Sequence, residues 1–560
     1  MNIRVLQGLN LKNPTTTVIA EMTAVKPELL DFFKQLHPVF MVDYSITGEK
    51  TLEVQTHLPN VWKNKELLHT LEQHGTGSLS YQEAEDKTLD IVRSFVSSMS
   101  TVPILSSAHT LGYETLQFFI NKGISETLRF NRSYTLGIGR EQEIFYSASS
   151  TKDSHQAVKV QKDKSFTNQA IENMGLPIAR WTLVDAREDL AEAAEKTGYP
   201  LVLKPVGLTG GHGVQIGMQN LQELEDAWDR THEYYEKEMK YPDSKSQQQM
   251  KIIIQRMLKG QDYRLLIVNG RFEVGTHRLQ AQVTGDGEHT VAQLIEEENK
   301  NPARDVRLPT HTLKPIVIDK DLVKVLTKQG LSVEYIPAKD ETVRVRDVAS
   351  MSQGGITADV TETVHPQIRL MCESIAKTLH AYVLGIDVLC QDITKPLTLD
   401  NGGIIEMNTM PEMYLNIYPV IGNSYPDVPT RFVQGLTEGK PRTRTVVVLG
   451  DVDSKSIHTQ VRTDISLAEY IGYMSNNTIY INEQAIQSDI DIEDCVLDLK
   501  KNALLDTIVL HYPTVEEVEQ NGFGFNTIDL LIATEEALSP IKPAVDGYIS
   551  NGRIAKLVVL

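Results

Sequence analysis

Short apolar runs alternate with amphipathic stretches over the first 150 residues of the chain. Ile3–Leu6 and Val18–Glu21 have the composition of short strands, whereas Pro27–Leu36 and Ala84–Met99 place apolar residues at helical spacing. A mixture of such elements is typical of an α+β domain. The pattern therefore predicts a domain of this kind over residues 1–150.

One stretch of this predicted domain holds side chains that are capable of chemistry. His109 and Glu114 lie in AHTLGYETLQFF, near an expected helix start. They are candidates for catalysis, but residues at such positions also cap helices or line a core. The sequence leaves both interpretations open.

A capped helix begins the central part of the chain. Asp163 is a good N-cap residue, and Gly175 with Pro177 ends the helix. Lys164 then lies in the first turn, where the helix dipole disfavours a cation and leaves its charge available to an anion. Lys164 is therefore a candidate phosphate ligand, with a solvated surface lysine as the alternative.

A strand followed by a glycine-rich loop comes next. Leu201–Leu203 leads into a lysine, and the glycines, which lack Cβ atoms, allow consecutive backbone N–H groups to converge on an anion. The lysine adds a point charge for the same phosphates. The pattern predicts a phosphate cradle, with an ordinary glycine-rich hairpin as the alternative. Its residues are Lys204, Gly207, Gly210, Gly211, His212 and Gly213.

The following segment is predicted as helix, strand, turn and strand. The helix is Leu221–Glu236, and the strands are Ile252–Ile254 and Leu265–Val268. The short connection between these strands is able to offer backbone N–H and C=O groups to an adenine ring, with an ordinary hairpin as the alternative. The candidate nucleotide contacts are Gln255, Met257, Leu258 and Asp262.

Three side chains with oxygen ligands follow on two further predicted strands. Asp387 lies among apolar residues, where a lone carboxylate is costly unless it is paired or bound to a cation. Glu406 and Asn408 are two residues apart, so their side chains point to the same face of a strand. Oxygen ligands that converge from neighbouring strands suit Mg²⁺. The sequence therefore predicts a magnesium site.

The last part of the chain begins with a buried strand at Thr443–Gly450. DVDSKS follows this strand, where a phosphate-binding loop would stand. Such a loop needs a glycine immediately before its lysine, but Ser454 precedes Lys455. The sequence therefore predicts a C-terminal α/β domain without a nucleotide site of this type.

Composition restricts the class of protein. A chain of 560 residues predicts three or four domains, consistent with segments 1–150, 151–437 and 438–560. No segment approaches the roughly 18 consecutive apolar residues of a membrane helix, and the N-terminus lacks the apolar core of a secretion signal. The three cysteines are widely spaced, and the net charge of −19 opposes nucleic-acid binding. We expect a cytoplasmic protein that binds neither membrane nor nucleic acid.

These features, in this order, resemble the ATP-grasp fold. More narrowly, DYRLLIVNGR, RLQAQVTGDGEHTVAQLIEEENKNPAR and SQGGITADVTETVHP are similar to the ATP-grasp half of cyanophycin synthetase, and more distantly to the corresponding domain of bifunctional glutathione synthetase. The resemblance covers about residues 150–435. It implies ATP and Mg²⁺ as cofactors, and a reaction in which a carboxylate and an amine give an amide, ADP and phosphate.

The resemblance also implies roles for individual residues. Lys164 and Lys204 match lysines that contact phosphates, and Arg278 matches an arginine that steadies an acyl phosphate. Lys204 and Arg278 are thus the implied catalytic residues. Asp262 matches a ribose contact, while Gln255 stands at an adenine contact where the family usually has Glu. The residues matched to regions that meet the substrate peptide are Arg264, Arg304, Ser352, Gly354 and Gly355.

The C-terminal part has a resemblance of its own. VEEVEQNGFGFNTIDLLIATEE resembles a segment of the Mur-ligase half of cyanophycin synthetase, which implies a truncated Mur-ligase domain; a small unrelated α/β domain is the alternative. The layout is similar to cyanophycin synthetases of the second type, which join preformed β-aspartyl-arginine dipeptides. A ligase for another short peptide, similar to glutathione synthetase, and a non-catalytic scaffold subunit remain as alternatives.

Together, the patterns predict a multi-domain α/β (α+β) protein, with an ATP-grasp domain between an α+β N-terminal domain and a small α/β C-terminal domain. We expect a homo-oligomer, dimer or tetramer, whose substrates are an amino acid, a dipeptide or a peptide polymer. An acyl phosphate must be protected from water. The candidate lids, chosen by composition, are Lys240–Gln249 and Asp347–Glu362.

Overall fold

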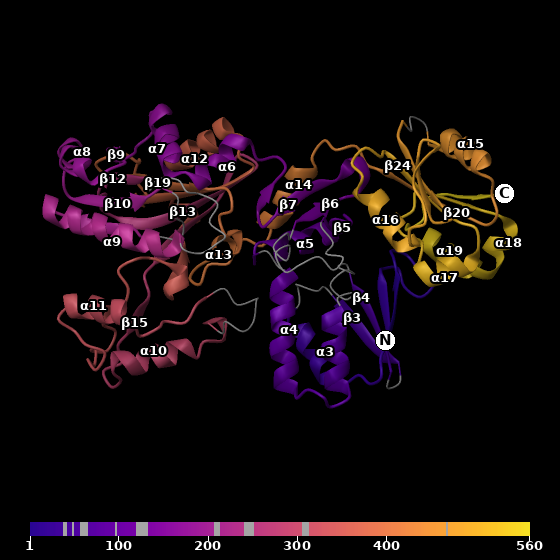
Figure 1. Cartoon of the computed structure of the whole chain (residues 1–560), viewed down its shortest axis with the longest axis horizontal. Coiled ribbons are helices and arrows are strands. Elements are labelled where there is room, and N and C mark those ends of the chain that lie inside the picture. The colour runs from indigo at the N-terminus through magenta and orange to yellow at the C-terminus, as the bar shows by residue number, and fades with distance from the viewer. Residues whose placement is uncertain are drawn as a thin grey trace. The chain divides into compact units, whose positions relative to one another are not determined.

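The chain forms two compact units, each composed of segments that are distant in sequence. Unit 1 combines chiefly Met1–Ser147 with Pro429–Leu560, and unit 2 comprises Ala148–Val306 and His311–Val428. Both mix helices and strands (Figure 1), so the predicted multi-domain α/β class is confirmed. The computed structural model describes residues 1–36, 42–47, 50–56, 65–95, 98–118, 133–206, 213–239, 251–304, 313–465 and 469–560.

Short strands and amphipathic helices form the first part of unit 1. The predicted α+β pattern is confirmed here, and the expected helices appear as α1 and α4. The strands are β1 (Asn2–Leu6), β2 (Thr17–Glu21), β3 (Val42–Thr47), β4 (Thr51–Thr56), β5 (Thr115–Gln117), β6 (Tyr134–Leu136) and β7 (Glu143–Tyr146). The helices are α1 (Pro27–Gln35), α3 (Lys65–Gly75), α4 (Tyr81–Phe95) and α5 (Thr101–Thr110). The first four strands pair in the order β1–β2–β4–β3.

A seven-stranded sheet forms the second part of unit 1. Its strands are β20 (Arg444–Leu449), β21 (Ile471–Ser475), β22 (Thr478–Ile481), β23 (Gln484–Gln487), β24 (Thr507–Tyr512), β25 (Leu530–Ala533) and β26 (Leu557–Val559). Their order is β23–β22–β21–β24–β20–β25–β26, with β20 parallel to both neighbours. The helices are α14 (Val428–Thr437), α15 (Ser454–Asp464), α16 (Ile492–Lys501), α17 (Val515–Asn521), α18 (Glu535–Leu538) and α19 (Lys542–Ser550). The predicted strand at 443–450 is thus an interior strand of the sheet, as its apolar sequence requires.

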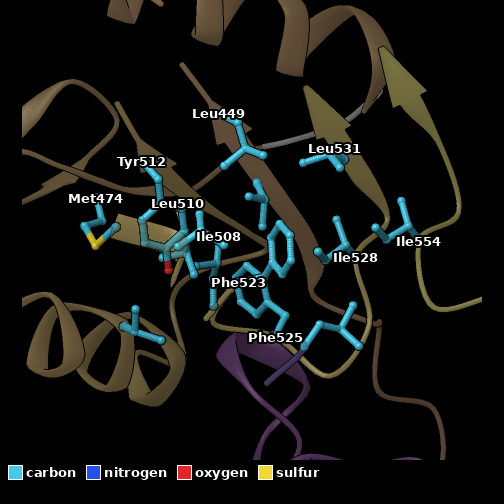
Figure 2. Packing of buried hydrophobic residues seen from close by; sticks show 14 of the residues in the cluster. Leu449, Met474, Ile508, Leu510, Tyr512, Phe523, Phe525, Ile528, Leu531 and Ile554 are labelled. Carbon is cyan, nitrogen blue, oxygen red and sulfur yellow. The ribbon is translucent and has the colours of Figure 1, made fainter. Parts of the chain in front are cut away.

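The two parts of unit 1 share one hydrophobic core. Phe523 and Phe525 (Figure 2) pack in the same cluster as Leu9 and Leu116. Gly8 has a φ of +65°, and a Cβ atom there would lie 2.3 Å from the backbone of Phe525. Segments predicted as first and last domains therefore lie in one compact unit, and the domain boundaries remain a prediction.

Glu114, one of the two candidate residues of the first part, has a structural partner. Its carboxylate pairs with Lys500 at 2.6 Å and accepts a hydrogen bond of 2.8 Å from the Asn526 N–H. His109 and Glu114 line one small cavity, and burial lowers the pKa of the His109 imidazole. A buried ion pair of this kind joins the two parts of the unit, which favours the structural interpretation of Glu114.

Unit 2 contains two larger antiparallel sheets and a two-stranded one. The first has the order β11–β10–β12–β9, formed by β9 (Trp181–Val184), β10 (Leu201–Pro205), β11 (Gln215–Met218) and β12 (Ile252–Arg256). Leu203 and Ile254 pack with α8 (Leu190–Thr197) and α9 (Leu221–Met239), which confirms the predicted helix after the glycine loop. Because strand side chains alternate, Lys204 and Gln255 lie on the other face of this sheet.

The second sheet of unit 2 has the order β17–β14–β13–β18–β19. Its strands are β13 (Gln261–Val268), β14 (Arg271–Leu279), β17 (Ile356–Asp359), β18 (Val383–Cys390) and β19 (Gly402–Asn408). One face packs its apolar residues, such as Leu265 and Ile386, on α12 (Pro366–Leu379). β12 and β13 belong to different sheets, so the connection at Arg256–Gly260 crosses between sheets, and the alternative of an ordinary hairpin is wrong.

A smaller lobe follows β14. Strands β15 (Gln282–Thr284) and β16 (Thr342–Arg344) pair with each other and pack on α10 (Val291–Asn299) and α11 (Lys320–Lys328). The remaining elements of unit 2 are β8 (Ser149–Ser150), α6 (His155–Lys162), α7 (Lys164–Asn173) and α13 (Met413–Ile417). Among the described helices, none is long and apolar enough to cross a membrane.

Two details of unit 2 bear on the sequence predictions. Asp163 caps α7, since its carboxylate accepts the N–H groups of Ser165 and Phe166, as predicted. The second candidate lid, Asp347–Glu362, contains β17, which is hydrogen-bonded into the sheet beside β14. Composition suggested a loop throughout, but that part of the segment is a sheet strand. The first candidate lid, Lys240–Gln249, lies outside the described residues.

Candidate active site

The second sheet of unit 2 carries charged side chains on the face opposite α12. Arg264 on β13 is paired in register with Asp387 on β18, which is paired with Glu406 on β19. In the adjacent row, Asp262 on β13 faces Arg278 on β14. Paired residues in an antiparallel sheet share a face. The register alone therefore brings together five of the residues that the sequence predicted, from four strands.

Asp387 is at the centre of this charged face. Only 2% of its side chain is exposed, and its carboxylate pairs with Arg264 and with Arg278. Arg264 Nη2 donates to Asp387 Oδ2 at 3.0 Å, and Arg278 Nη2 donates to the same oxygen at 2.9 Å. Burial alone would raise the pKa of Asp387, but the two guanidinium groups hold it below its usual value.

Arg278 is bound on its other side by Asp262. Its Nη2 donates to Asp262 Oδ1 at 2.6 Å, and its Nε donates to the same oxygen at 3.1 Å. Burial raises the pKa of Asp262, although Arg278 acts in the opposite direction. Asp262, predicted as a ribose contact, thus lies beside the predicted catalytic arginine and fixes its orientation.

Lys204 on β10 is close enough to this charged face to interact with Asp387 and Glu406. Its Nζ donates to Gln255 Oε1 at 2.8 Å, across the pair β10–β12. The pKa of Lys204 is lowered to about 8, chiefly by burial; Glu406 and Asp387 oppose this shift, and the charge of Lys164 adds to it. Burial also lowers the pKa of Lys164, against the attraction of Glu406. The two predicted phosphate lysines and the predicted metal ligand Glu406 are therefore close enough to interact.

Two predicted adenine contacts, Met257 and Leu258, lie in the connection between the sheets. They differ in whether the backbone N–H group already donates a hydrogen bond. The Met257 N–H donates to Pro200 O at 2.8 Å and is already occupied. Among the described residues, none accepts a hydrogen bond from the Leu258 N–H. Gly403 on β19 allows close packing here, since a Cβ atom would lie 3.0 Å from Leu258 Cδ1. Of this pair, Leu258 is the one whose backbone donor is available to a ligand.

Most of the predicted phosphate cradle is not covered by the structure. Gly207, Gly210, Gly211 and His212 lie outside the described residues. Gly213 is described and has a φ of +71°, a backbone conformation that favours glycine. The assignment of this loop as a phosphate cradle therefore stays a prediction.

The predicted magnesium ligands differ in what surrounds them. In the described part of the chain, neither the half-buried Glu406 carboxylate nor the Asn408 amide has a hydrogen-bond partner, and both lie on one face of β19. Their oxygen atoms thus fit a hard cation. Asp387 offers its oxygens to arginines instead. Within the described ranges, no group of three or more His, Cys, Asp or Glu side chains is placed to hold a metal ion.

Apart from Arg264 on β13, the predicted peptide-binding residues lie at the smaller lobe, where Arg304 is a structural link. Its buried guanidinium pairs with Glu298 at 3.0 Å and donates to Lys314 O at 2.6 Å and to Gly354 O at 3.1 Å. Gly354 has a φ of +89° and packs on Ile316. The remaining two predicted residues lie nearby. Gly355 packs against Leu279 O, and the hydroxyl groups of Ser352 and Ser350 share a hydrogen bond of 2.8 Å.

Sequence reasoning missed the loop that braces Arg264. Arg264 Nη1 donates to Pro411 O at 3.0 Å, and Asn416 Nδ2 donates to the same carbonyl at 3.1 Å. Thr276 on β14 completes the link by donating to Asn416 Oδ1 at 2.7 Å. Glu412, with a positive φ of 50°, shapes the turn. The nearest signal in the sequence was the stretch NTMPEMYLN, which begins two residues after Glu406.

Comparisons with known proteins match parts of the chain. A family model described as phosphoribosylglycinamide synthetase, ATP-grasp (A) domain, matches residues 162–277. A bifunctional glutathione synthetase from Pasteurella multocida is similar in structure, with a TM-score of 0.46, 23% sequence identity, and coverage of 64% of this chain and 46% of that one.

Curated relatives match more of the chain. The cyanophycin synthetase of Synechocystis sp. is 31% identical over 437 residues, which are 74% of this chain and 48% of the relative. The glutathione biosynthesis bifunctional protein GshAB of Mannheimia succiniciproducens is 28% identical over 275 residues, 49% of this chain and 35% of the relative. The chain thus spans about half the length of the curated relatives it matches. The chain is similar to cyanophycin synthetases over 74% of its length, and its central part is an ATP-grasp domain.

Proposed function

We propose that the chain is an ATP-dependent carboxylate–amine ligase that forms amide bonds through an acyl phosphate and joins β-aspartyl-arginine dipeptides into cyanophycin. The names of the relatives support the product. The observation that carries the reaction type is the charged sheet face, on which two arginines meet at Asp387 within the electrostatic reach of Lys204. Such a set of charges suits phosphoryl transfer to a carboxylate.

Phosphoryl transfer needs positioning and neutralised charge rather than a covalent enzyme group. Lys164 and Lys204 would bind the phosphates of ATP, and Arg278 would hold the substrate carboxylate in line. A carboxylate oxygen attacks the γ-phosphorus, and the bond from this phosphorus to the bridging oxygen breaks, which releases ADP. The product of this first step is an acyl phosphate.

The amine of the second substrate then attacks the acyl carbon. Arg278 and Lys204 stabilise the oxyanion of the tetrahedral state, since both carry charge in a site largely shielded from water. The phosphate leaves with the electron pair of the C–O bond, and the nitrogen loses a proton to give the amide. Arg264, fixed between Asp387 and Pro411 O, keeps the carboxylate of Asp387 and hence Arg278 in place.

Glu406 and Asn408 are the residues that would hold Mg²⁺, because their side chains share a face and have no hydrogen-bond partner in the described chain. When bound, the ion neutralises phosphate charge. Asp387 was expected to be a third ligand. Since both its oxygens bind arginines in this structure, we propose that it chiefly positions Arg264 and Arg278.

The structure around Asp453 favours a C-terminal part that has no nucleotide site of its own. Asp453 caps α15, and its carboxylate accepts the Ser456 N–H at 3.0 Å and the Ser456 hydroxyl at 2.5 Å. These contacts hold the pKa of Asp453 below its usual value. The helix N-terminus where a phosphate would bind thus already holds an anion from the chain itself. We propose a truncated Mur-ligase-like part without a second ligase activity; the expected homo-oligomer stays a prediction.

Phosphate release tests the proposed function. Purified protein is incubated with ATP, Mg²⁺ and single candidate substrates, beside the variant Lys204→Ala as a background control. Release with β-aspartyl-arginine alone is the expected result. Release only with other amino acids or peptides would instead favour a ligase for another short peptide, as in the relatives named for glutathione biosynthesis. No release with any substrate would leave the scaffold alternative.

The low pKa of Lys204 predicts a pH dependence. Below about pH 8 this lysine is protonated and attracts phosphate, and above it the charge is lost, so kcat/KM for ATP is expected to fall as the pH rises through about 8. Gln255→Glu places a carboxylate beside Lys204 Nζ, which favours the charged form and moves the fall to higher pH. Gln255→Leu is the matched control without added charge. A profile that Gln255→Glu leaves unchanged would contradict the assignment.

A further inference from the structure

Glu412 lies in the loop between β19 and α13 and has an unusual backbone conformation. Its φ of 50° and ψ of 60° fall in the left-handed region, which a Cβ atom disfavours and which glycine usually occupies. Residues in such conformations persist where the surrounding structure fixes them, and they cluster at functional sites. A glutamate that is kept in this conformation is therefore a candidate for a role of its side chain.

Hydrogen bonds hold the backbone of Glu412 on the charged sheet face. Asn416 Nδ2 donates to Glu412 O at 3.0 Å and to Pro411 O at 3.1 Å. Pro411 O also accepts a hydrogen bond of 3.0 Å from Arg264 Nη1. Thr276, which is paired in register with Arg264, donates to Asn416 Oδ1 at 2.7 Å. The loop is thereby fixed to the face of the sheet that carries Arg264.

The carboxylate of Glu412 is available to a ligand. Among the residues that the structure describes, none donates a hydrogen bond to this carboxylate or forms an ion pair with it. The residue is exposed to solvent, yet the protein around the carboxyl group partly desolvates it and raises its pKa, against the attraction of Arg264. A raised pKa makes a carboxylate a better proton acceptor.

The other carboxylates at this sheet face are already engaged. Asp387 and Asp262 pair with arginines. Asp359 accepts hydrogen bonds from a tyrosine hydroxyl and from a backbone N–H. Glu406 is proposed to bind Mg²⁺. Within the described part of the chain, Glu412 is thus the carboxylate at this face that is left to exchange a proton with a substrate.

The second step of the proposed reaction requires such a group. A neutral amine that attacks the acyl carbon becomes positively charged at its nitrogen, and this nitrogen must lose one proton before the amide forms. Lys204 and Arg278 act as cations in this step because they stabilise the oxyanion, so neither of them accepts the proton.

We propose that the Glu412 carboxylate accepts the proton that the attacking amine gives up. This inference rests on the proposed function for the type of reaction. As the nitrogen bonds to the acyl carbon, its proton passes to a carboxylate oxygen of Glu412, and the phosphate leaves with the electron pair of the C–O bond. Because Glu412 is exposed, the proton then passes to water and the carboxylate is restored.

The test separates the two steps of the reaction in Glu412→Gln, which keeps the size of the side chain but cannot accept the proton. Acyl phosphate formation is measured with an amine-blocked dipeptide, N-acetyl-β-aspartyl-arginine, by trapping with hydroxylamine, a strong nucleophile that needs no enzyme base. Joining of unblocked dipeptides is measured by chromatography of the product. We expect the variant to trap at the wild-type rate but to join dipeptides about 100-fold more slowly, since a general base contributes at least that much.

Two further variants serve as controls. Glu412→Gly also removes the carboxylate but suits the positive φ, so we expect the same selective loss of joining with a thermal midpoint no lower than that of the wild type. Glu195→Gln removes an exposed carboxylate on α8 and is expected to trap and to join like the wild type.

The inference is overturned if either Glu412 variant joins dipeptides at the wild-type rate. It is also overturned if trapping and joining fall equally, because Glu412 would then act in the first step or in folding. A wild-type chain that neither forms the hydroxamate nor joins dipeptides overturns the proposed function, and the inference with it. The two kinds of failure are therefore distinguished by the wild type alone.

Discussion

Asp387→Asn is expected to abolish phosphate release and also to lower the free energy of unfolding by about 3–5 kcal/mol, the usual cost of removing one partner from a buried ion pair. The reason is the position of Asp387 between Arg264 and Arg278, with almost no exposure. Neutralising it leaves two guanidinium groups without their shared anion. Urea titration of the variant and the wild type, followed by circular dichroism, measures the loss of stability.

Glu406→Gln is the matched control for that experiment. Glu406 is half-buried and has no hydrogen-bond partner in the described chain, so replacing its charge costs little stability. We expect this variant to unfold like the wild type but to lose activity, because it would bind Mg²⁺ poorly. Wild-type activity in Glu406→Gln would show that Glu406 is not a magnesium ligand. Wild-type stability in Asp387→Asn would show that the arginines find other partners.

Lys204→Ala is expected to reduce phosphate release by a factor of about 100 or more, because the lysine neutralises charge that develops in the transition state. Lys455→Ala is expected to leave it unchanged. Lys455 belongs to α15, whose N-terminus is capped by Asp453. The carboxylate of Asp453 thus already stands where a phosphate would bind. Initial rates of phosphate release at saturating dipeptide compare the two variants directly.

A loss of activity in Lys455→Ala would contradict the proposed single nucleotide site. If Lys455→Ala removes one of two separable ATPase activities, the C-terminal part contains a working nucleotide site. The proposal of a single-site dipeptide ligase would then be wrong. Isothermal titration with a non-hydrolysable ATP analogue gives a second measure, since one bound nucleotide per chain is expected for the wild type and for Lys455→Ala.

Strand periodicity explains why so much of the charged face was predictable. Glu406 and Asn408 are two residues apart, and Asp387 interrupts an apolar run, so each signal was local. The pairing of Asp387 with two arginines was not predictable, because it depends on the register of β13, β14 and β18. A sequence pattern that assigns residues to a face does not determine which strands become neighbours.

The same limit applies to Arg304 and to the first part of the chain. An arginine in a loop is expected to meet solvent or substrate, but Arg304 is buried by contacts with Glu298, Lys314 O and Gly354 O. Likewise, the packing of Leu9 against the cluster around Phe523 joins positions 514 residues apart. Contacts at that separation leave no local pattern.

That long-range core also sets the order in which the chain can fold during synthesis. Unit 2 is inserted between the two segments of unit 1, and its residues emerge from the ribosome before Phe523 does. At ~5–20 residues per second, roughly 25 to 100 s separate the synthesis of Leu9 from that of Phe523. The first segment must wait through this interval with apolar side chains uncovered, and the hydrogen bond from the Tyr548 hydroxyl to Asn10 O forms later still. The nascent chain is therefore most vulnerable to aggregation, and most dependent on chaperones, just before its last domain segment is released.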